Sequence, residues 1–382
     1  MKLFHFVMLV LLAAHFTPGS FAEVIMSPPL GINKVTCLAN SDTIVGIPFR
    51  KSGSRSTLIS GTPTLAAGQA EGVTDLWVVP LTNLTLQADS LNTHYLHITS
   101  GTHDGRWYDI VANSTNSVTI NLNGDDLTGV AQNDRVTIAE YGNLDTLYPP
   151  AQATTGWTED PENLGTFVQN GHAIVGSNGT GSRSRKTEIL YPDLIGLGIN
   201  RAATKQYFID LQSGEWKDSF DNSTANDIRL WPDVSFTIRH PSVISSSTIY
   251  AANGEVETNK MAILLASITT GKHDNFIAIP RPVDVALVDL NLGGTDAFVG
   301  SDGIGSRSRK DELLLVDNMI QGRNKAATKQ YYFDTSGAGV WRDSFDNSDA
   351  SLAVIPAGTG FVIRKSNSLT EATHFWQQTP SY

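Results

Sequence analysis

The sequence predicts a mainly β fold made of two tandem repeated β-sandwich or barrel-like units, with a small β domain inserted in the first unit. Short runs rich in Val, Ile, Thr, Tyr and Phe are separated by Gly, Asn, Asp and Ser about every eight to twelve residues. No stretch keeps apolar residues at helical spacing over three turns. Residues 181–210 and 305–334 are identical at 18 of 30 aligned positions, which indicates a duplication and so defines the architecture.

The expected strands follow one another along the chain. DTIVGIP at 42–48 opens the first unit, and the similar DNFIAIP at 274–280 lies at the matching place in the second. Between them, the clearest strand signals of the inserted domain are LWVVP (76–80), YLHIT (95–99), SVTINL (117–122) and RVTIA (135–139). The predicted limits are residues 23–60 plus 151–249 for the first unit, 61–150 for the insert and 250–382 for the second unit.

Residues 1–22 have the features of a secretory signal peptide. Lys2 precedes an apolar run from Leu3 to Phe16, and Ser20 and Ala22 place small residues before the expected cleavage site. No later stretch is apolar for long enough to span a bilayer, so no transmembrane segment is expected after cleavage. We expect an exported protein that is secreted, periplasmic or on the cell surface.

The cysteine count and the charge narrow the class of protein further. Cys37 is the only cysteine, so no intramolecular disulfide can form, as is typical of a bacterial envelope or secreted protein. The chain has 27 Lys plus Arg against 38 Asp plus Glu, a formal net charge of −11. This balance disfavours nucleic acid as a partner, because its phosphates are bound mainly by Lys and Arg.

A Gly- and Ser-rich loop with the sequence GSRSRK occurs in both units. Its guanidinium groups could bind carboxylate, sulfate or phosphate groups of an anionic polysaccharide or of a lipid headgroup. The alternative is that they pair within the protein, for example with Glu188 and Glu312. The candidate ligand-binding residues are Arg183, Arg185, Lys186, Arg307, Arg309 and Lys310.

The segment DSFDNS also occurs twice and collects oxygen atoms of the kind that calcium binds. No calcium-loop consensus is present, and Asx turns explain the same residues without a metal. Calcium therefore remains one interpretation, and no other cofactor is expected. The candidate ligands are Asp218, Asp221, Asn222 and Asp227 in the first unit and Asp343, Asp346, Asn347 and Asp349 in the second.

Trp216 and Trp341 occupy aligned positions in the two units. Exposed, they would form a platform on which sugar rings stack. Buried, they would belong to the cores, and strand alternation favours this second interpretation.

The order of several segments resembles an uncharacterised family of secreted proteins that occurs as many paralogues in verrucomicrobial bacteria. The resemblance rests on DTIVGIP (42–48), GTHDGRWYDIVANSTNSVTINLNGDDLTGV (101–130), ATKQYF (203–208), DNFIAIPRPVDV (274–285) and PAGTGFVIRK (356–365). It covers nearly the whole chain after residue 22. The GSRSRK loop and the DSFDNS segment are variable in that family, and the resemblance implies no activity or catalytic residues.

The leading functional expectation is a non-enzymatic exported β protein that works by binding or assembly. Two similar units favour this reading, because two weak sites on one chain gain avidity. The expected partners are extracellular polysaccharide or other envelope proteins. One alternative is a polysaccharide hydrolase that uses the repeated carboxylates Glu188 and Glu312, and another is a purely structural surface subunit.

Overall fold

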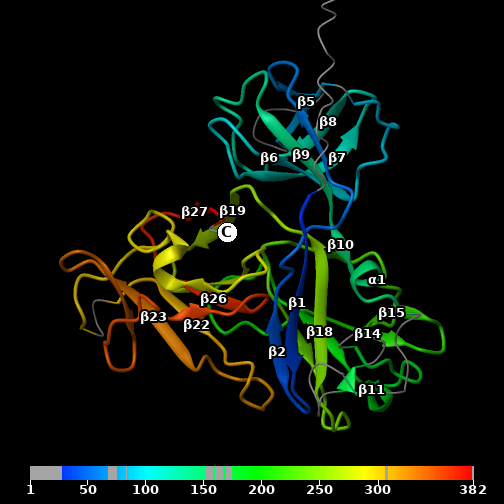
Figure 1. Ribbon diagram of the computed structural model, residues 1–382, viewed down its shortest axis with the longest axis vertical. Coiled ribbons are helices and arrows are strands. Elements are labelled where there is room, and N and C mark those ends of the chain that lie inside the picture. Colours follow the sequence, from blue (N-terminus) through cyan, green and yellow to red (C-terminus); the bar gives the residue numbers. More distant parts are fainter. Residues whose placement is uncertain are drawn as a thin grey trace, which may run out of the picture.

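The computed structural model describes residues 28–67, 75–82, 84–150, 158–159, 167–168, 174–305 and 309–380. Nearly all regular structure in these residues is β, which confirms the predicted fold class. Three bodies of sheet are visible: two units side by side and a third sheet above them (Figure 1). Within the described residues, no helix has the length and apolar character needed to cross a membrane.

The first unit is built on a five-stranded antiparallel sheet in the order β15–β14–β13–β17–β2. A ribbon of β1 (Leu30–Cys37) and β18 (Thr248–Glu255) packs against it, because Val35 and Tyr250 share one buried core with Ile189. The sheet strands are β2 (Asp42–Val45), β13 (Glu188–Tyr191), β14 (Lys205–Asp210), β15 (Glu215–Asp218) and β17 (Phe236–Arg239).

The second unit has a five-stranded sheet in the order β24–β23–β22–β26–β20. Each strand occupies the place of the strand with which it aligns in sequence, and the ribbon of β19 (Met261–Ser267) and β27 (Ala372–Gln378) takes the place of β1 and β18. Its sheet strands are β20 (His273–Ala278), β22 (Glu312–Leu315), β23 (Lys329–Asp334), β24 (Val340–Asp343) and β26 (Gly360–Lys365).

Short elements complete both units. In the first they are β10 (Gly142–Asn143), α1 (Leu144–Leu147), β11 (Thr158–Glu159), β12 (Phe167–Val168), η2 (Ser182–Ser184) and β16 (Arg229–Leu230). In the second they are β21 (Val285–Ala286), η3 (Leu287–Leu290) and β25 (Val354–Ile355). β10 pairs with β16 as β21 pairs with β25.

The inserted sheet has seven strands in the order β3–β9–β6–β7–β8–β5–β4 and a core of its own. Alternation of buried and half-buried residues is clearest in β8, with the pattern expected of a sheet with one face on a core. The strands are β3 (Arg55–Leu58), β4 (Thr64–Leu65), β5 (Leu76–Pro80), β6 (His94–Ile98), β7 (Trp107–Asn113), β8 (Ser117–Asn121) and β9 (Arg135–Glu140).

The sheets begin and end at residues that differ from the limits drawn from the sequence. The inserted sheet runs from Arg55 to Glu140 rather than over 61–150. The limit drawn at 249/250 falls inside β18, which pairs along its whole length with β1 of the first unit. Strand pairing over long sequence separations decides these boundaries, and local pattern does not contain that information.

The two units meet at the edges of their five-stranded sheets. Val45, at the end of β2, forms an isolated bridge with Thr359 of the second unit, and Ile277 of β20 forms the aligned bridge with Val234 of the first. Each bridge joins the edge strand of one unit to the residues just before β26 or β17 in the other unit. Such reciprocity is what a twofold relation between the units requires.

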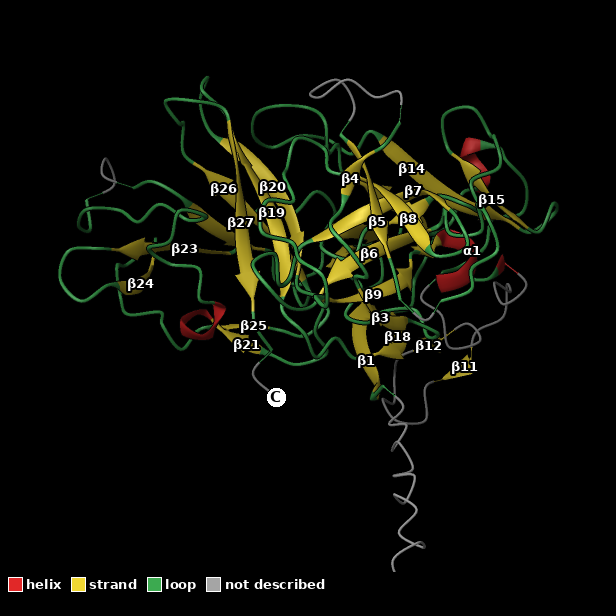
Figure 2. Ribbon diagram, turned by 90° about the horizontal axis from the view of Figure 1, so that it is seen from above, coloured by secondary structure: helices red, strands yellow, loops and turns green. Residues whose placement is uncertain are grey.

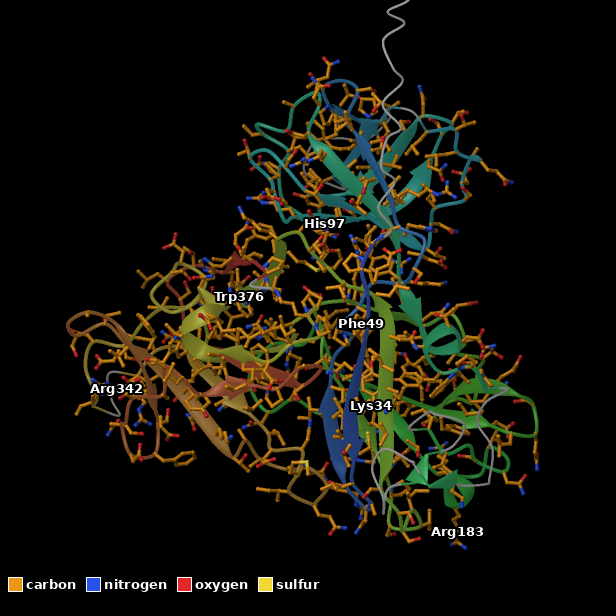
Figure 3. All side chains as sticks on the ribbon, in the orientation of Figure 1. Lys34, Phe49, His97, Arg183, Arg342 and Trp376 are labelled. Atoms are coloured by element: carbon orange, nitrogen blue, oxygen red, sulfur yellow. The ribbon has the colours of Figure 1, made fainter. Side chains whose placement is uncertain are left out.

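A buried polar cluster fixes the inserted sheet to the segment that joins the two units. His97, fully buried at the base of the inserted sheet (Figure 3), has its Nε2 2.8 Å from the carbonyl oxygen of Lys260. Its Nδ1 lies 3.5 Å from Oε2 of Glu257, which is also 3.0 Å from Nη1 of Arg50. The pKa of the Glu257 carboxyl is lowered: burial acts to raise it, but the hydrogen bond and charge of His97 and the charge of Arg50 outweigh burial.

Candidate functional site

The two aligned tryptophans lie in the cores of their units. Trp216 is fully buried and donates its indole N–H to the carbonyl oxygen of Tyr148 at 2.9 Å. Trp341 is 3% exposed and packs against Phe298, with ring centroids 5.0 Å apart. Neither ring offers a face to a ligand, so the stacking platform considered for them is not formed.

One arginine of each GSRSRK loop braces the DSFDNS turn of the same unit. Arg185 donates from Nη2 to the carbonyl oxygen of Ser219 at 2.6 Å, and Arg309 donates in the same way to Ser344 at 2.6 Å. Each guanidinium also lies 4.9 Å from the centre of an aromatic ring on the neighbouring strand. These two arginines are occupied inside the protein, and the predicted pairing with Glu188 and Glu312 is replaced by pairing with backbone carbonyls.

The other basic residues of the two loops are more open. Arg183 is exposed on η2 and points away from the body of the molecule (Figure 3). Lys310 is exposed and Lys186 is half-buried. Arg307 lies outside the described residues. What remains for a ligand is therefore a small number of separate surface cations.

The oxygen-rich DSFDNS segments are Asx turns. Oδ1 of Asp218 accepts the backbone N–H two residues later at 2.8 Å, and Oδ1 of Asp343 does the same at 2.7 Å. Among the described residues, no group of three His, Cys, Asp or Glu side chains is arranged to hold a metal ion. Of the other candidate ligands, Asp221, Asp346 and Asp349 also accept a backbone N–H two residues on, Asn222 and Asn347 adopt positive φ, and Asp227 is exposed.

Glu188 and Glu312 lie on β13 and β22, each within its own sheet. Glu188 accepts a hydrogen bond from the hydroxyl of Ser219 at 3.3 Å. Glu312 is buried and is held by Lys272 at 2.8 Å and by the side-chain amide of Gln330 at 2.5 Å. Both carboxylates thus have partners inside their own units.

A cleft with a volume of about 440 Å³ lies where the three bodies of sheet meet. The inserted sheet contributes β7 and the turn after β8. The first unit contributes the segment before β17 and the loop between β13 and β14, and the second contributes β19, β20 and β27. Its aromatic lining consists of Trp107, Tyr108, Trp231, Phe276 and Phe375.

Trp107 and Trp231 form the aromatic wall of the cleft. Their ring centroids are 5.8 Å apart with an interplanar angle of 41°, and both pack on Tyr141. Trp107 also donates its indole N–H to the carbonyl oxygen of Ala262 on β19 at 3.1 Å. The wall therefore joins the inserted sheet to both units, and its rings are held in place while remaining half-buried.

Three carboxylates of the cleft are already paired with arginines. Asp109 binds Arg229 at 3.1 Å, and Asp125 binds Arg106 at 2.6 Å. Asp274 binds an arginine of its own sheet, with a shortest contact of 2.7 Å. These groups are fixed acceptors, with their charge balanced inside the protein.

Asp233 is the exception among the acidic residues that line the cleft. It is 7% exposed and has no ion pair with any described residue. Burial raises the pKa of its carboxyl to about 7, although the backbone N–H groups of Asp233 and Leu264 act to lower it. The aligned position in the second unit is Gly358, so this carboxyl belongs to the first unit alone.

The cleft was missed by sequence reasoning because its lining comes from seven separate stretches of chain. Leu194 and Leu264, 46% and 48% exposed, add an apolar border from two of them. No motif links these stretches, and the only local signal was the Trp-Tyr-Asp sequence at 107–109. Comparison with protein-family models, with curated proteins and with solved structures found no match for this chain.

Proposed function

We propose that this protein is an exported, non-enzymatic binding protein that holds a saccharide in the cleft between the three sheets. The observation that carries the proposal is the half-buried wall of Trp107 and Trp231 beside fixed carboxylates and amides. A sugar ring has an apolar C–H face that packs on aromatic rings, and hydroxyl groups that donate to carboxylates. One cleft supplies both kinds of contact.

The size and border of the cleft fit this ligand class. Pockets for small molecules typically have volumes of roughly 300–1,000 Å³, and about 440 Å³ lies inside that range. Asn121 adds a side-chain amide whose N–H groups can donate to a sugar hydroxyl, whereas the amide of Asn275 is held by the backbone of Ala266 and Ile363. The apolar side chains of Leu194 and Leu264 at the border can pack against parts of the sugar that do not contact the aromatic wall.

Hydrolysis of the bound saccharide is the alternative that one observation favours. The raised pKa of Asp233 would suit a proton donor near neutral pH. Glycoside hydrolysis, however, needs a second carboxyl group as base or nucleophile. Asp109, Asp125 and Asp274 are each bound to an arginine, so each already has a partner inside the protein. Binding is therefore the better-supported function.

The test is a thermal-shift screen of the chain from Glu23 against neutral, uronic and sulfated oligosaccharides, followed by calorimetry. A ligand at about a hundred times its dissociation constant should stabilise the folded state by roughly 2.7 kcal/mol. Trp231→Phe should weaken binding about 3- to 10-fold through lost stacking area. Trp77→Phe, a matched change of a half-buried tryptophan in the inserted sheet that does not line the cleft, should leave binding unchanged.

The same samples separate binding from hydrolysis. Reducing ends should not accumulate when the wild-type protein is incubated with the oligosaccharide that it binds. Release of reducing ends that is abolished by Asp233→Asn would establish the hydrolase instead. No stabilisation by any saccharide, or equal weakening by both tryptophan variants, would reject the cleft as a saccharide site.

A further inference from the structure

The two DSFDNS turns expose a large aromatic side chain at the same place in each unit. Phe220 follows β15 and is 65% exposed, and Phe345 follows β24 and is 69% exposed. Transfer of a phenylalanine side chain from water to a buried site is favourable. Each turn therefore offers a favourable contact that the folded chain leaves unused.

Hydrogen bonds hold the backbone of the turn that carries each ring. The backbone N–H of each phenylalanine donates to the aspartate two residues before it, at 2.8 Å in the first unit and 2.7 Å in the second. The carbonyl of the preceding serine accepts a hydrogen bond from Arg185 or Arg309. A partner that binds these rings loses little entropy in ordering the turns.

An exposed phenylalanine is present at the same position in both copies. SFDNS is identical at 219–223 and 344–348. In the neighbouring loop the exposed Leu197 aligns with Gln321, whereas the exposed Ile195 aligns with the exposed Met319. The stability of the units does not require an exposed ring, so its presence at both sites points to a contact outside the chain.

The two turns lie at opposite ends of the molecule. Figure 2 shows β15 and β24 at the two extremes of the view, with the ribbons and the inserted sheet between them. Each end also carries both signs of charge. Asp221 and Lys205 are exposed at one end, and Asp346 and Lys329 are exposed at the other. A surface that carries an exposed ring together with both signs of charge can match a second copy of itself.

We propose that each turn is a self-association site, and that copies of this chain bind end to end, turn against turn. The occupant is a second copy because the surface is self-complementary in charge and because the same surface stands at both ends. Because each chain has two such sites, association produces open linear oligomers rather than a closed dimer. A turn-sized contact is small, so each link is weak and assembly rises with concentration.

Sedimentation velocity at increasing protein concentration tests this, with Phe220→Ser, Phe345→Ser and the double variant. The wild type should form dimers, trimers and longer species. Each single variant keeps one site and should stop at the dimer, and the double variant should stay monomeric. Leu369→Ser, which removes a fully exposed leucine elsewhere, is the matched control and should assemble like the wild type.

Three outcomes would overturn the proposal. One is a wild type that stays monomeric at every concentration, and another is a double variant that assembles as the wild type does. The third is a double variant that loses stabilisation by a saccharide without any change in sedimentation, since that would assign the turns to ligand binding. Because both rings are exposed, circular dichroism and the melting temperature should match the wild type in all variants.

Discussion

Gly46 and Ala278 lie face to face where the two units meet. A Cβ atom built on Gly46 would come 2.2 Å from the Cβ of Ala278. These two residues align with each other in DTIVGIP and DNFIAIP. A residue that meets its own counterpart lies close to a twofold axis, so the axis that relates the two units passes near this contact.

We expect Gly46→Ala to separate the edges of the two sheets. Real Cβ atoms do not approach to 2.2 Å, and the atom that is met is a short side chain on a strand, so backbone must move. Overpacking of this kind costs about 1–3 kcal/mol of unfolding free energy. The double variant Gly46→Ala/Ala278→Gly exchanges the two aligned residues and should regain most of the loss, as measured by denaturant unfolding.

Gly61→Ala is the control for this exchange. Its new Cβ would meet Pro80 at 3.7 Å, an ordinary contact, so stability should change little. If the exchange variant were no more stable than Gly46→Ala alone, the clash with Ala278 would not be the cause of the loss.

The buried carboxyl of Asp233 should make the stability of the protein fall with rising pH. Its pKa is about 7 in the folded state against an ordinary value of 3.8, so the folded state binds more protons between these pH values. The free energy of unfolding therefore decreases as pH rises from about 4 to about 7 and levels off above that. Asp233→Asn keeps the shape of the side chain and removes the charge.

The comparison of wild type with Asp233→Asn across pH isolates this group. The two should be close in stability near pH 4, and the variant should be more stable by about 2–4 kcal/mol at pH 8. Other titrating groups contribute equally to both proteins and cancel. Unfolding curves whose difference does not change with pH would show that Asp233 is not buried in its neutral form.

Local pattern predicted the strands well because alternation is a property of single strands. The run expected at 76–80 is β5 with the same bounds, and Trp216 points into the core as its place in the alternating pattern EWKD suggested. The cleft depends instead on three bodies of sheet coming together. Nothing near Asp233 in the sequence marks it as a buried carboxyl, because its burial is created by β19 of the other unit.

Calcium and chelators should leave the melting temperature of the protein unchanged. The aspartates of the DSFDNS turns already use an oxygen to accept a backbone N–H, as at Asp218 and Asp343. Calcium needs six to eight oxygen ligands, and turns of this geometry offer few that converge. A chelator-reversible rise in the melting temperature with calcium, abolished by Asp221→Ala and Asp346→Ala, would contradict this expectation.

Asp42 and the aligned Asp274 should be equally important for holding the units together. Oδ1 and Oδ2 of Asp42 accept hydrogen bonds from Nε and Nη2 of Arg239 in its own sheet, both at 2.7 Å, and Oδ2 also accepts the backbone N–H of Asn324 from the second unit at 2.7 Å. An arginine and an asparagine bind Asp274 in the same arrangement, with the roles of the units exchanged.

Asp42→Asn or Asp274→Asn leaves a partly buried arginine without its counter-ion, so each should lower the unfolding free energy by about 3 kcal/mol. Glu371→Gln, at an exposed site, should have almost no effect. Because each aspartate ties a loop of one unit to the edge strand of the other, hydrogen exchange should rise in both partners of the broken contact. If Asp42→Asn speeds hydrogen exchange in the first unit but leaves exchange in the loop around Asn324 unchanged, the contact does not couple the two units.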